Sequence, residues 1–281
     1  MKIKLVFDGT LVLNEREQKD YNIVITPFII NDNGTIYRDN VDVSPEEFYD
    51  LWRKNNYMKT SQPNIGETTE LFKKLLEDYD YIIYFTLPEV LSGTYATGKL
   101  VAKEVDESRI TVVDAKTGVG MGRIMAKIGN QMIADGKSVE EIVEHLSQAY
   151  KHSTLFVWPT KYDGLRAGGR ISNISASIFG LIKMRICIFM AQSGYLEKFA
   201  MARTDKKILK EIIENVKDNL GTEDLIIYLI YSDDKSALQP PRELFEKEFP
   251  NAEYRYMPFP PTLGAHTGPD TISFHFCKKH W

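Results

Sequence analysis

Short apolar runs, each followed by a helix-like pattern, constrain the fold of this chain more than any other feature. Residues 81–87 read YIIYFTL, residues 110–114 read ITVVD and residues 224–231 read DLIIYLIY. Runs of this length without polar alternation are typical of strands that are covered on both faces. The strand–loop–helix order of the first half therefore predicts a mainly parallel sheet with helices on both sides, a three-layer α/β/α arrangement.

Helix starts fall between these runs. Ser44 and Glu47 can form a capping box around Pro45, and Ser138 and Glu141 can form another. Residues 23–30, IVITPFII, are predicted to form a single further strand.

The chain changes character after residue 152. Residues 153–158 are predicted to form a strand that crosses into a second domain, and residues 184–191 and 195–202 flank a Ser-Gly turn as a β-hairpin. We therefore expect two α/β domains, 1–152 and 153–281.

Composition excludes several classes of protein. Hydrophobic residues make up 43% of the chain and the net charge is −4 without a long basic run, which argues against nucleic-acid binding. Cys187 and Cys277 are too far apart for a metal-binding spacing, so neither a metal nor a cofactor is expected. No apolar stretch approaches the ~20 residues that span a bilayer, and the N-terminal one is too short for a signal peptide, so we expect a cytoplasmic protein without membrane insertion.

Two motifs suggest phosphate chemistry but lack essential parts. Asp8-Gly9-Thr10 is similar to the start of haloacid-dehalogenase phosphatases, yet Val6 stands where the nucleophilic aspartate is needed. We expect Asp8 to bond local backbone at a strand end instead. Gly118, Gly120 and Gly122 lack the GxGxxG spacing of a dinucleotide site and indicate tight packing at a helix start.

A set of hydroxyls and one histidine suits a carboxylate. Thr60 and Ser61 precede a helix, and Ser92 and Thr94 follow the YIIYFTL run, where ligands of parallel sheets bind. His266 lies among glycines and a proline, which predicts a shaped loop. Hydroxyl and imidazole donors of this kind can hold a carboxylate by hydrogen bonds.

The same residues allow other functions. Ser92, Asp114 and His266 follow the chain order of an α/β-hydrolase triad acting on an acyl ester. Val90 replaces the first glycine of the G-x-S-x-G elbow, which favours a hydrogen-bonding role for Ser92. A regulatory module that binds another small acid is a third interpretation, and the identity of a co-purified ligand would separate it from the first.

At these residues the sequence resembles the DegV family of bacterial fatty-acid-binding proteins, over essentially its whole length. Five motifs in the family's order carry the resemblance: Thr60-Ser61-Gln62-Pro63, Leu91-Ser92-Gly93-Thr94-Tyr95, Gly168-Gly169-Arg170-Ile171-Ser172, Arg203-Thr204 and His266-Thr267-Gly268-Pro269.

The resemblance implies a two-domain DegV-like fold that buries one long-chain fatty acid of the palmitate, stearate or oleate class. It implies a carrier rather than an enzyme, with the catalytic subunit of a fatty acid kinase as the partner that phosphorylates the bound carboxylate. Thr60, Ser61, Ser92 and His266 would contact the head group, and Arg170 and Arg203 would dock the kinase.

Three positions depart from the family pattern. Gly9 stands in place of a serine, Ala115 stands where serine is frequent, and Ile182-Lys183-Met184-Arg185 replaces a common Ile-Lys-Pro turn. Any role of the missing hydroxyl at Gly9 cannot be carried over.

Overall fold

The computed structural model describes residues 1–55, 58–162, 165, 169–171 and 184–281. It divides into two compact units, of which the first comprises residues 1–44 and 57–150 and the second residues 45–56 and 151–281.

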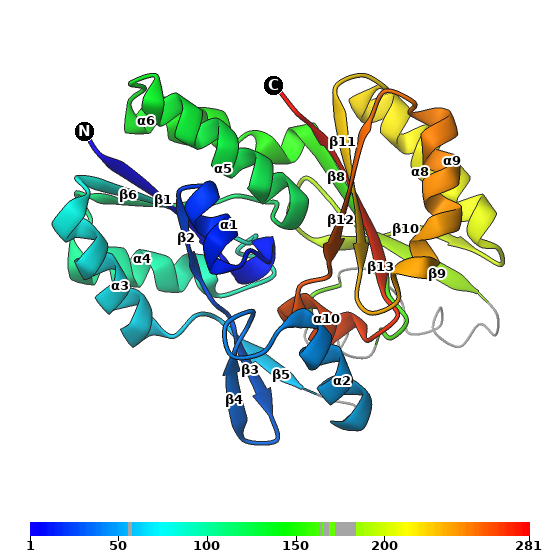
Figure 1. Ribbon diagram of the computed structural model, residues 1–281, viewed down its shortest axis with the longest axis horizontal. Helices are drawn as coiled ribbons and strands as arrows, with labels where there is room; N and C mark the ends of the chain where they lie inside the picture. The colour runs from blue at the N-terminus through cyan, green and yellow to red at the C-terminus, as the bar shows by residue number, and fades with distance from the viewer. Residues whose placement is uncertain (56–57, 163–164, 166–168, 172–183) are drawn as a thin grey trace. The chain divides into compact units, whose positions relative to one another are not determined.

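A parallel four-stranded sheet forms the centre of the first unit (Figure 1). Its strands run in the order β2-β1-β6-β7, with the bounds β1 Ile3–Asp8, β2 Ile23–Thr26, β6 Tyr81–Thr86 and β7 Ile110–Asp114. The helices are η1 Gly9–Leu11, α1 Glu15–Asp20, α3 Ile65–Asp78, α4 Thr94–Val105, α5 Val119–Ala134 and α6 Val139–Leu146.

Helices cover both faces of this sheet. Val6 of β1 belongs to a buried cluster with Phe72 of α3 and Val101 of α4. Leu5 points to the opposite face because neighbouring strand residues alternate. There it lies against Gly129 of α5, whose missing Cβ would sit 2.6 Å from Leu5 Cδ1. The predicted parallel sheet in three layers is therefore confirmed.

A small antiparallel sheet also belongs to the first unit. Its strands, in the order β4-β3-β5, are β3 Ile29–Asp32, β4 Thr35–Arg38 and β5 Lys59–Ser61. The prediction of one strand over residues 23–30 is wrong, because β2 ends at Thr26 and β3 begins at Ile29 in a different sheet. Pro27 separates the two; it has no N–H to donate to a strand ladder, which favours the break there.

The described strands of the second unit form a mixed six-stranded sheet, in which β11 and β12 pair parallel and the other neighbouring strands pair antiparallel. The order β10-β9-β8-β13-β11-β12 uses β8 Ser153–Trp158, β9 Arg185–Met190, β10 Leu196–Ala202, β11 Leu225–Tyr231, β12 Glu253–Pro258 and β13 Ile272–Lys278. The other elements among the described residues of this unit are α2 Pro45–Asn55, α8 Asp205–Leu220, η4 Lys235–Leu238, α9 Gln239–Glu248 and α10 Pro261–Thr267. The short helix η2 Ala149–His152 includes the sequence boundary between the two units.

The predicted hairpin is present as β9 and β10, which pair antiparallel. One face of the sheet packs against α8 and α9, where Ile212, Phe245, Phe274 and Phe276 are buried in one cluster.

Candidate functional site

A tight turn presents Ser92 between β6 and α4. The backbone N–H groups of Leu91 and Ser92 donate to the carbonyl of Pro88 at 2.9 and 3.1 Å. Ser92 Oγ lies 2.7 Å from Thr94 Oγ1, and it accepts from the Thr94 backbone N–H at 3.3 Å. If Thr94 donates to Ser92, the Ser92 proton remains available for a ligand, because each hydroxyl carries a single donor. Ser92 is half-buried, so this proton can reach a bound group.

Thr60 and Ser61 lie on β5, paired with Ile30 and Ile29 of β3. Ser61 is exposed and Thr60 half-buried. The next residue, Gln62, donates from Nε2 to Thr97 Oγ1 of α4. The strand that carries Thr60 and Ser61 is thereby joined to the first turn of α4.

Gly93 allows this approach of Gln62. A Cβ at Gly93 would collide with Gln62 Oε1, so a larger residue there would push the amide away. No role was expected for Gln62 from the sequence, although it stands within the motif Thr60-Ser61-Gln62-Pro63. The first unit thus brings the two hydroxyl motifs together, through a residue that the donor set did not include.

His266 lies on helix α10, so its expected position on a shaped loop is wrong. Pro261 occupies the first turn, where its missing N–H costs nothing, and Gly268 ends the helix at φ 82°. The surrounding proline and glycine are therefore the start and stop signals of a short helix. His266 is half-buried in the last turn of this helix.

A contact with α2 holds α10. Tyr49 is buried and its hydroxyl donates to the carbonyl of Phe259 at 3.2 Å. Gly264 faces the Tyr49 ring so closely that an added Cβ would collide with it. The position of the His266 helix within the second unit therefore depends on this aromatic–glycine contact.

The two arginines differ in their surroundings. Arg170 is half-buried, and its backbone N–H donates to the carbonyl of Leu165 at 3.1 Å. Arg203 is exposed between β10 and α8, and no described residue pairs with its guanidinium. Gly168 and Ser172 of the same motif lie outside the described residues, as do Ile182 and Lys183.

The hydrolase alternative gains no support from the partners of Ser92. Its hydroxyl bonds Thr94, which cannot serve as a general base at neutral pH. Asp114 ends β7 and accepts from the backbone N–H of Lys116 at 3.1 Å. Burial raises the pKa of Asp114, with a smaller opposing contribution from that backbone hydrogen bond.

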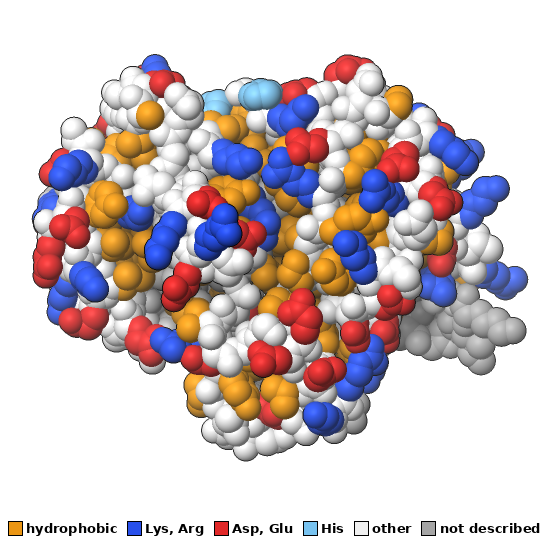
Figure 2. All heavy atoms as spheres, in the orientation of Figure 1, with side chains coloured by type: hydrophobic (Ala, Val, Ile, Leu, Met, Phe, Trp, Pro, Cys, Tyr) orange, Lys and Arg blue, Asp and Glu red, His pale blue; other side chains and the backbone are white. Residues whose placement is uncertain are grey.

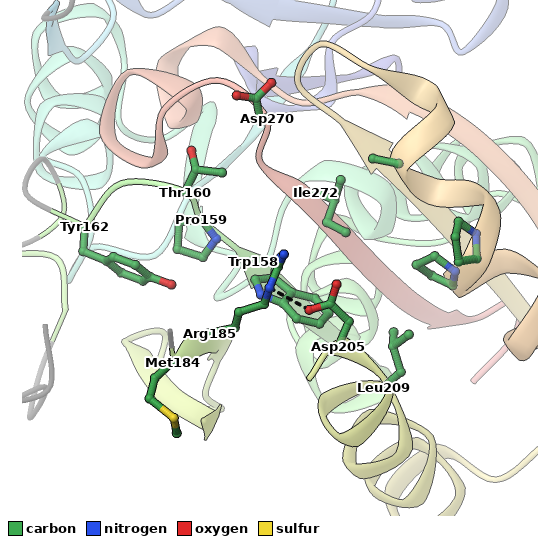
Figure 3. Close-up of a pocket in the computed structure, with 13 residues that line it drawn as sticks. Trp158, Pro159, Thr160, Tyr162, Met184, Arg185, Asp205, Leu209, Asp270 and Ile272 are labelled. Carbon is green, nitrogen blue, oxygen red and sulfur yellow. Dashed lines mark ion pairs between the residues drawn. The ribbon is translucent and has the colours of Figure 1, made fainter. Parts of the chain in front are cut away.

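A pocket of about 520 Å³ opens in the second unit (Figure 3). Its walls are mostly apolar, with Trp158 of β8, Leu209 of α8 and Ile272 of β13 among them. Arg185 and Asp205 lie at the pocket as an ion pair of 2.9 Å. The volume falls within the ~300–1,000 Å³ that is usual for small-molecule sites.

The pocket wall is bonded to the end of α10. Thr160, which lines the pocket, donates its hydroxyl to the carbonyl of Pro269, and the Lys161 N–H donates to the carbonyl of Thr267 at 3.0 Å. The segment after His266 is therefore attached to an apolar pocket of the same unit.

Metal-ligand groups and membrane-spanning helices are both absent from the described part of the chain. No three His, Cys, Asp or Glu side chains gather there as a metal ion would require. None of the helices in these ranges is both long and apolar enough to cross a membrane. Acidic and basic side chains are interspersed on the face that Figure 2 presents.

Comparison with known proteins gives full-length matches. A DegV domain-containing protein of Caldanaerobacter subterraneus subsp. tengcongensis is 30% identical over 281 residues, which is 99% of both chains. A fatty acid-binding protein of Thermotoga maritima is 26% identical, over 98% of this chain and 97% of its own.

Solved structures also match over the full length of the chain. A fatty-acid-binding DegV family protein from Thermus thermophilus matches with a TM-score of 0.88 and 25% identity, over 99% of this chain and 100% of its own. A hypothetical protein from Thermotoga maritima, described as having a fatty acid binding function, matches with a TM-score of 0.82 and 26% identity, over 99% of each chain. The model of the DegV family of uncharacterised proteins matches residues 2–279, and the chain therefore belongs to the DegV family.

Proposed function

We propose that this protein binds a single long-chain fatty acid and presents its carboxylate to a fatty acid kinase. The observation that carries the proposal is the full-length similarity to DegV structures described as binding fatty acids. The protein would act as a carrier, with phosphorylation catalysed by the partner.

Hydroxyl groups hold the carboxylate in this proposal. Thr60, Ser61 and Ser92 contribute donors, Thr94 completes the site by donating its own proton to Ser92, and His266 contributes a further donor. The short distance between Ser92 Oγ and Thr94 Oγ1 supports the assignment, because such a pair can direct one proton outward. Neutral donors also leave a carboxylate oxygen nucleophilic, whereas a fixed cation would withdraw charge from it.

The acyl tail supplies the affinity. Burying about 15 carbons at ~0.8 kcal/mol each gives on the order of 12 kcal/mol before the cost of ordering the chain and the protein. A buried carboxylate without partners would cost several kcal/mol, so the hydroxyls are needed to offset that loss.

Native mass spectrometry of gently purified protein tests the binding. We expect a mass increment of one fatty acid, or uptake of added palmitate by the ligand-free protein. Protein that carries no fatty acid and takes up none would refute the proposal. An ester-like fluorophosphonate probe should leave Ser92 unlabelled, and labelling there would favour the hydrolase.

Substitution of Ser92 tests the head-group assignment. Ser92→Ala should weaken palmitate binding about tenfold, the equivalent of one hydrogen bond to a charged group. Ser147→Ala is the matched control, because Ser147 is half-buried and donates only to the nearby carbonyl of Glu144. Equal affinities of the two variants would remove Ser92 from the site.

Substitution of the exposed Arg203 tests the partner. Arg203→Glu should leave palmitate affinity unchanged and slow phosphorylation of the bound acid by the kinase subunit. Arg16→Glu, on α1 of the first unit, is the charge-matched control. Unchanged phosphorylation in Arg203→Glu would exclude this residue from kinase docking.

A further inference from the structure

The carboxylate of Asp8 is buried at the end of β1 and accepts hydrogen bonds from three donors. Oδ1 accepts from the backbone N–H of Thr10 at 3.1 Å and from its hydroxyl at 2.6 Å. Oδ2 accepts from the backbone N–H of Leu87. The two bonds from Thr10 are local, whereas the bond from Leu87 connects two neighbouring strands at the edge where their loops begin.

Leu87 is the first residue of the turn that presents Ser92. It follows the last residue of β6, and the next residue, Pro88, provides the carbonyl that accepts from the Ser92 N–H. A displacement of Leu87 would therefore move the accepting carbonyl and the Ser92 hydroxyl with it.

A second set of hydrogen bonds holds the turn that follows Asp8. Arg123 of α5 donates to the carbonyls of Leu11 and Val12 at 3.0 and 2.6 Å. Val12 has φ 46°, a left-handed conformation that is rare for a β-branched residue, so this turn needs such support. These hydrogen bonds hold the loop after β1 in place, and Asp8 at its start binds the backbone N–H of Leu87.

The local turn alone does not require a buried acid. At an exposed site, Asp106 accepts the same two hydrogen bonds from Ser108: one from its backbone N–H at 3.0 Å and one from its hydroxyl at 2.6 Å. Burying a carboxylate is unfavourable unless it is fully hydrogen-bonded. The feature that separates Asp8 from Asp106 is the bond from Leu87.

We propose that Asp8 is a positioning residue, which locates the Ser92 hydroxyl through the backbone N–H of Leu87. The inference rests on the proposed function for the role of Ser92. Asp8 itself is only 2% exposed, so the role proposed for it acts through Leu87 and not through direct contact with the ligand.

Asp8→Asn is the informative variant. An amide has one accepting oxygen, and the two bonds from Thr10 hold that oxygen in the place of Oδ1. The NH₂ group then faces the Leu87 N–H, donor against donor, and the link is lost while the local turn stays. Asp106→Asn is the matched control, because it alters the same kind of turn without a bond to another strand.

Hydrogen–deuterium exchange of ligand-free protein and palmitate titration measure the effect together. In Asp8→Asn, amides of residues 87–93 should exchange about tenfold faster and palmitate should bind about tenfold more weakly. In Asp106→Asn both quantities should match the wild type. An Asp8→Asn protein with wild-type exchange in residues 87–93 and wild-type affinity would overturn the inference.

Two further outcomes are separable. If wild-type protein binds no palmitate, the proposed function fails, and the exchange of residues 87–93 alone decides whether Asp8 positions the turn. If Asp8→Asn does not fold, Thr10→Val removes one of the three donors. It should give a smaller increase of exchange in residues 87–93, and an unchanged rate there would overturn the inference.

Discussion

His275 should make the second unit sensitive to mild acid. It lies in the middle of β13, between Tyr228 of β11 and Leu155 of β8, and is 0% exposed. Neither ring nitrogen has a hydrogen-bond partner among the described residues. Burial disfavours the charged form and lowers the pKa of His275 to about 3.

The direction of the effect follows from proton linkage. In the unfolded chain the imidazole has its ordinary pKa of about 6.5, so between pH 6.5 and 3 the unfolded state binds more protons than the folded state. The free energy of unfolding therefore has its full value above the pKa of the unfolded chain's imidazole, and it falls as the pH drops below that pKa. From pH 7 to pH 5 the loss amounts to about 2 kcal/mol, at 1.36 kcal/mol per pH unit over about 1.5 units.

His275→Leu removes this dependence. An apolar side chain of similar size leaves no unsatisfied nitrogen, so stability at pH 7 should rise by about 1–2 kcal/mol. The loss between pH 7 and pH 5 should be smaller than in the wild type by about 2 kcal/mol. The other four histidines are common to both proteins, so their contributions cancel in this difference.

Urea unfolding followed by tryptophan fluorescence is the assay. Trp52, Trp158 and Trp281 are all the tryptophans of the chain, and all lie in the second unit, so the signal reports on the unit that contains His275. Equal losses of stability between pH 7 and pH 5 in the wild type and in His275→Leu would refute the reasoning.

Three further substitutions have defined expectations. Gly264→Ala places a Cβ against Tyr49 and should lower the stability of the second unit by about 1–3 kcal/mol in the same fluorescence assay. In a protein that already carries Tyr49→Leu the cost of Gly264→Ala should be smaller, and additive effects of the two substitutions would contradict the contact. Ser138→Ala removes the cap of α6 and should cost about 1 kcal/mol in thermal unfolding followed by circular dichroism, whereas an unchanged midpoint would contradict the capping bond. Arg53 forms ion pairs with Asp233 and Asp270, and because its side chain is 45% exposed, Arg53→Gln should lower the stability by less than about 1 kcal/mol. High salt should reduce this difference in urea unfolding, and a difference that persists at high salt would show that salt does not screen these ion pairs.

The strands and helix starts that depend on local pattern were predictable. The runs at 81–87 and 110–114 form β6 and β7, and Ser138 and Glu141 make the capping box that their spacing indicates. Apolar runs and caps act within a few residues, so the sequence alone contains the necessary information.

Features that depend on distant partners were missed. The apolar run at 23–30 does not reveal that its two halves pair with strands of different sheets, and Pro27 was the local signal of the break. His266 was expected on a loop, although Pro261 and Gly268 are the start and stop signals of a short helix.

Hydrogen bonds around the candidate site show the same difference between local and distant contacts. Ser92 and Thr94 are two residues apart in the sequence, and their hydroxyl oxygens lie 2.7 Å from each other. The expected bond of Asp8 to local backbone is present at Thr10, but the bond from Leu87 spans 79 positions and leaves no local pattern. Gln62 was missed for the same reason, since Thr97 is distant in sequence.

Asp8 and His275 show why two buried polar residues should respond oppositely to substitution. Burial raises the pKa of Asp8, but hydrogen bonds from Thr10 and Leu87 oppose that shift and stabilise the carboxylate. His275 has no such bonds among the described residues, and burial alone accounts for its lowered pKa. Removing the carboxylate of Asp8 leaves its buried hydrogen-bond donors without an acceptor, which costs free energy. Removing the imidazole of His275, which has no such partners, relieves a cost that is already present in the folded state. Replacement of Asp8 should therefore destabilise its surroundings and the Ser92 turn, while replacement of His275 by a residue of similar volume should stabilise the fold.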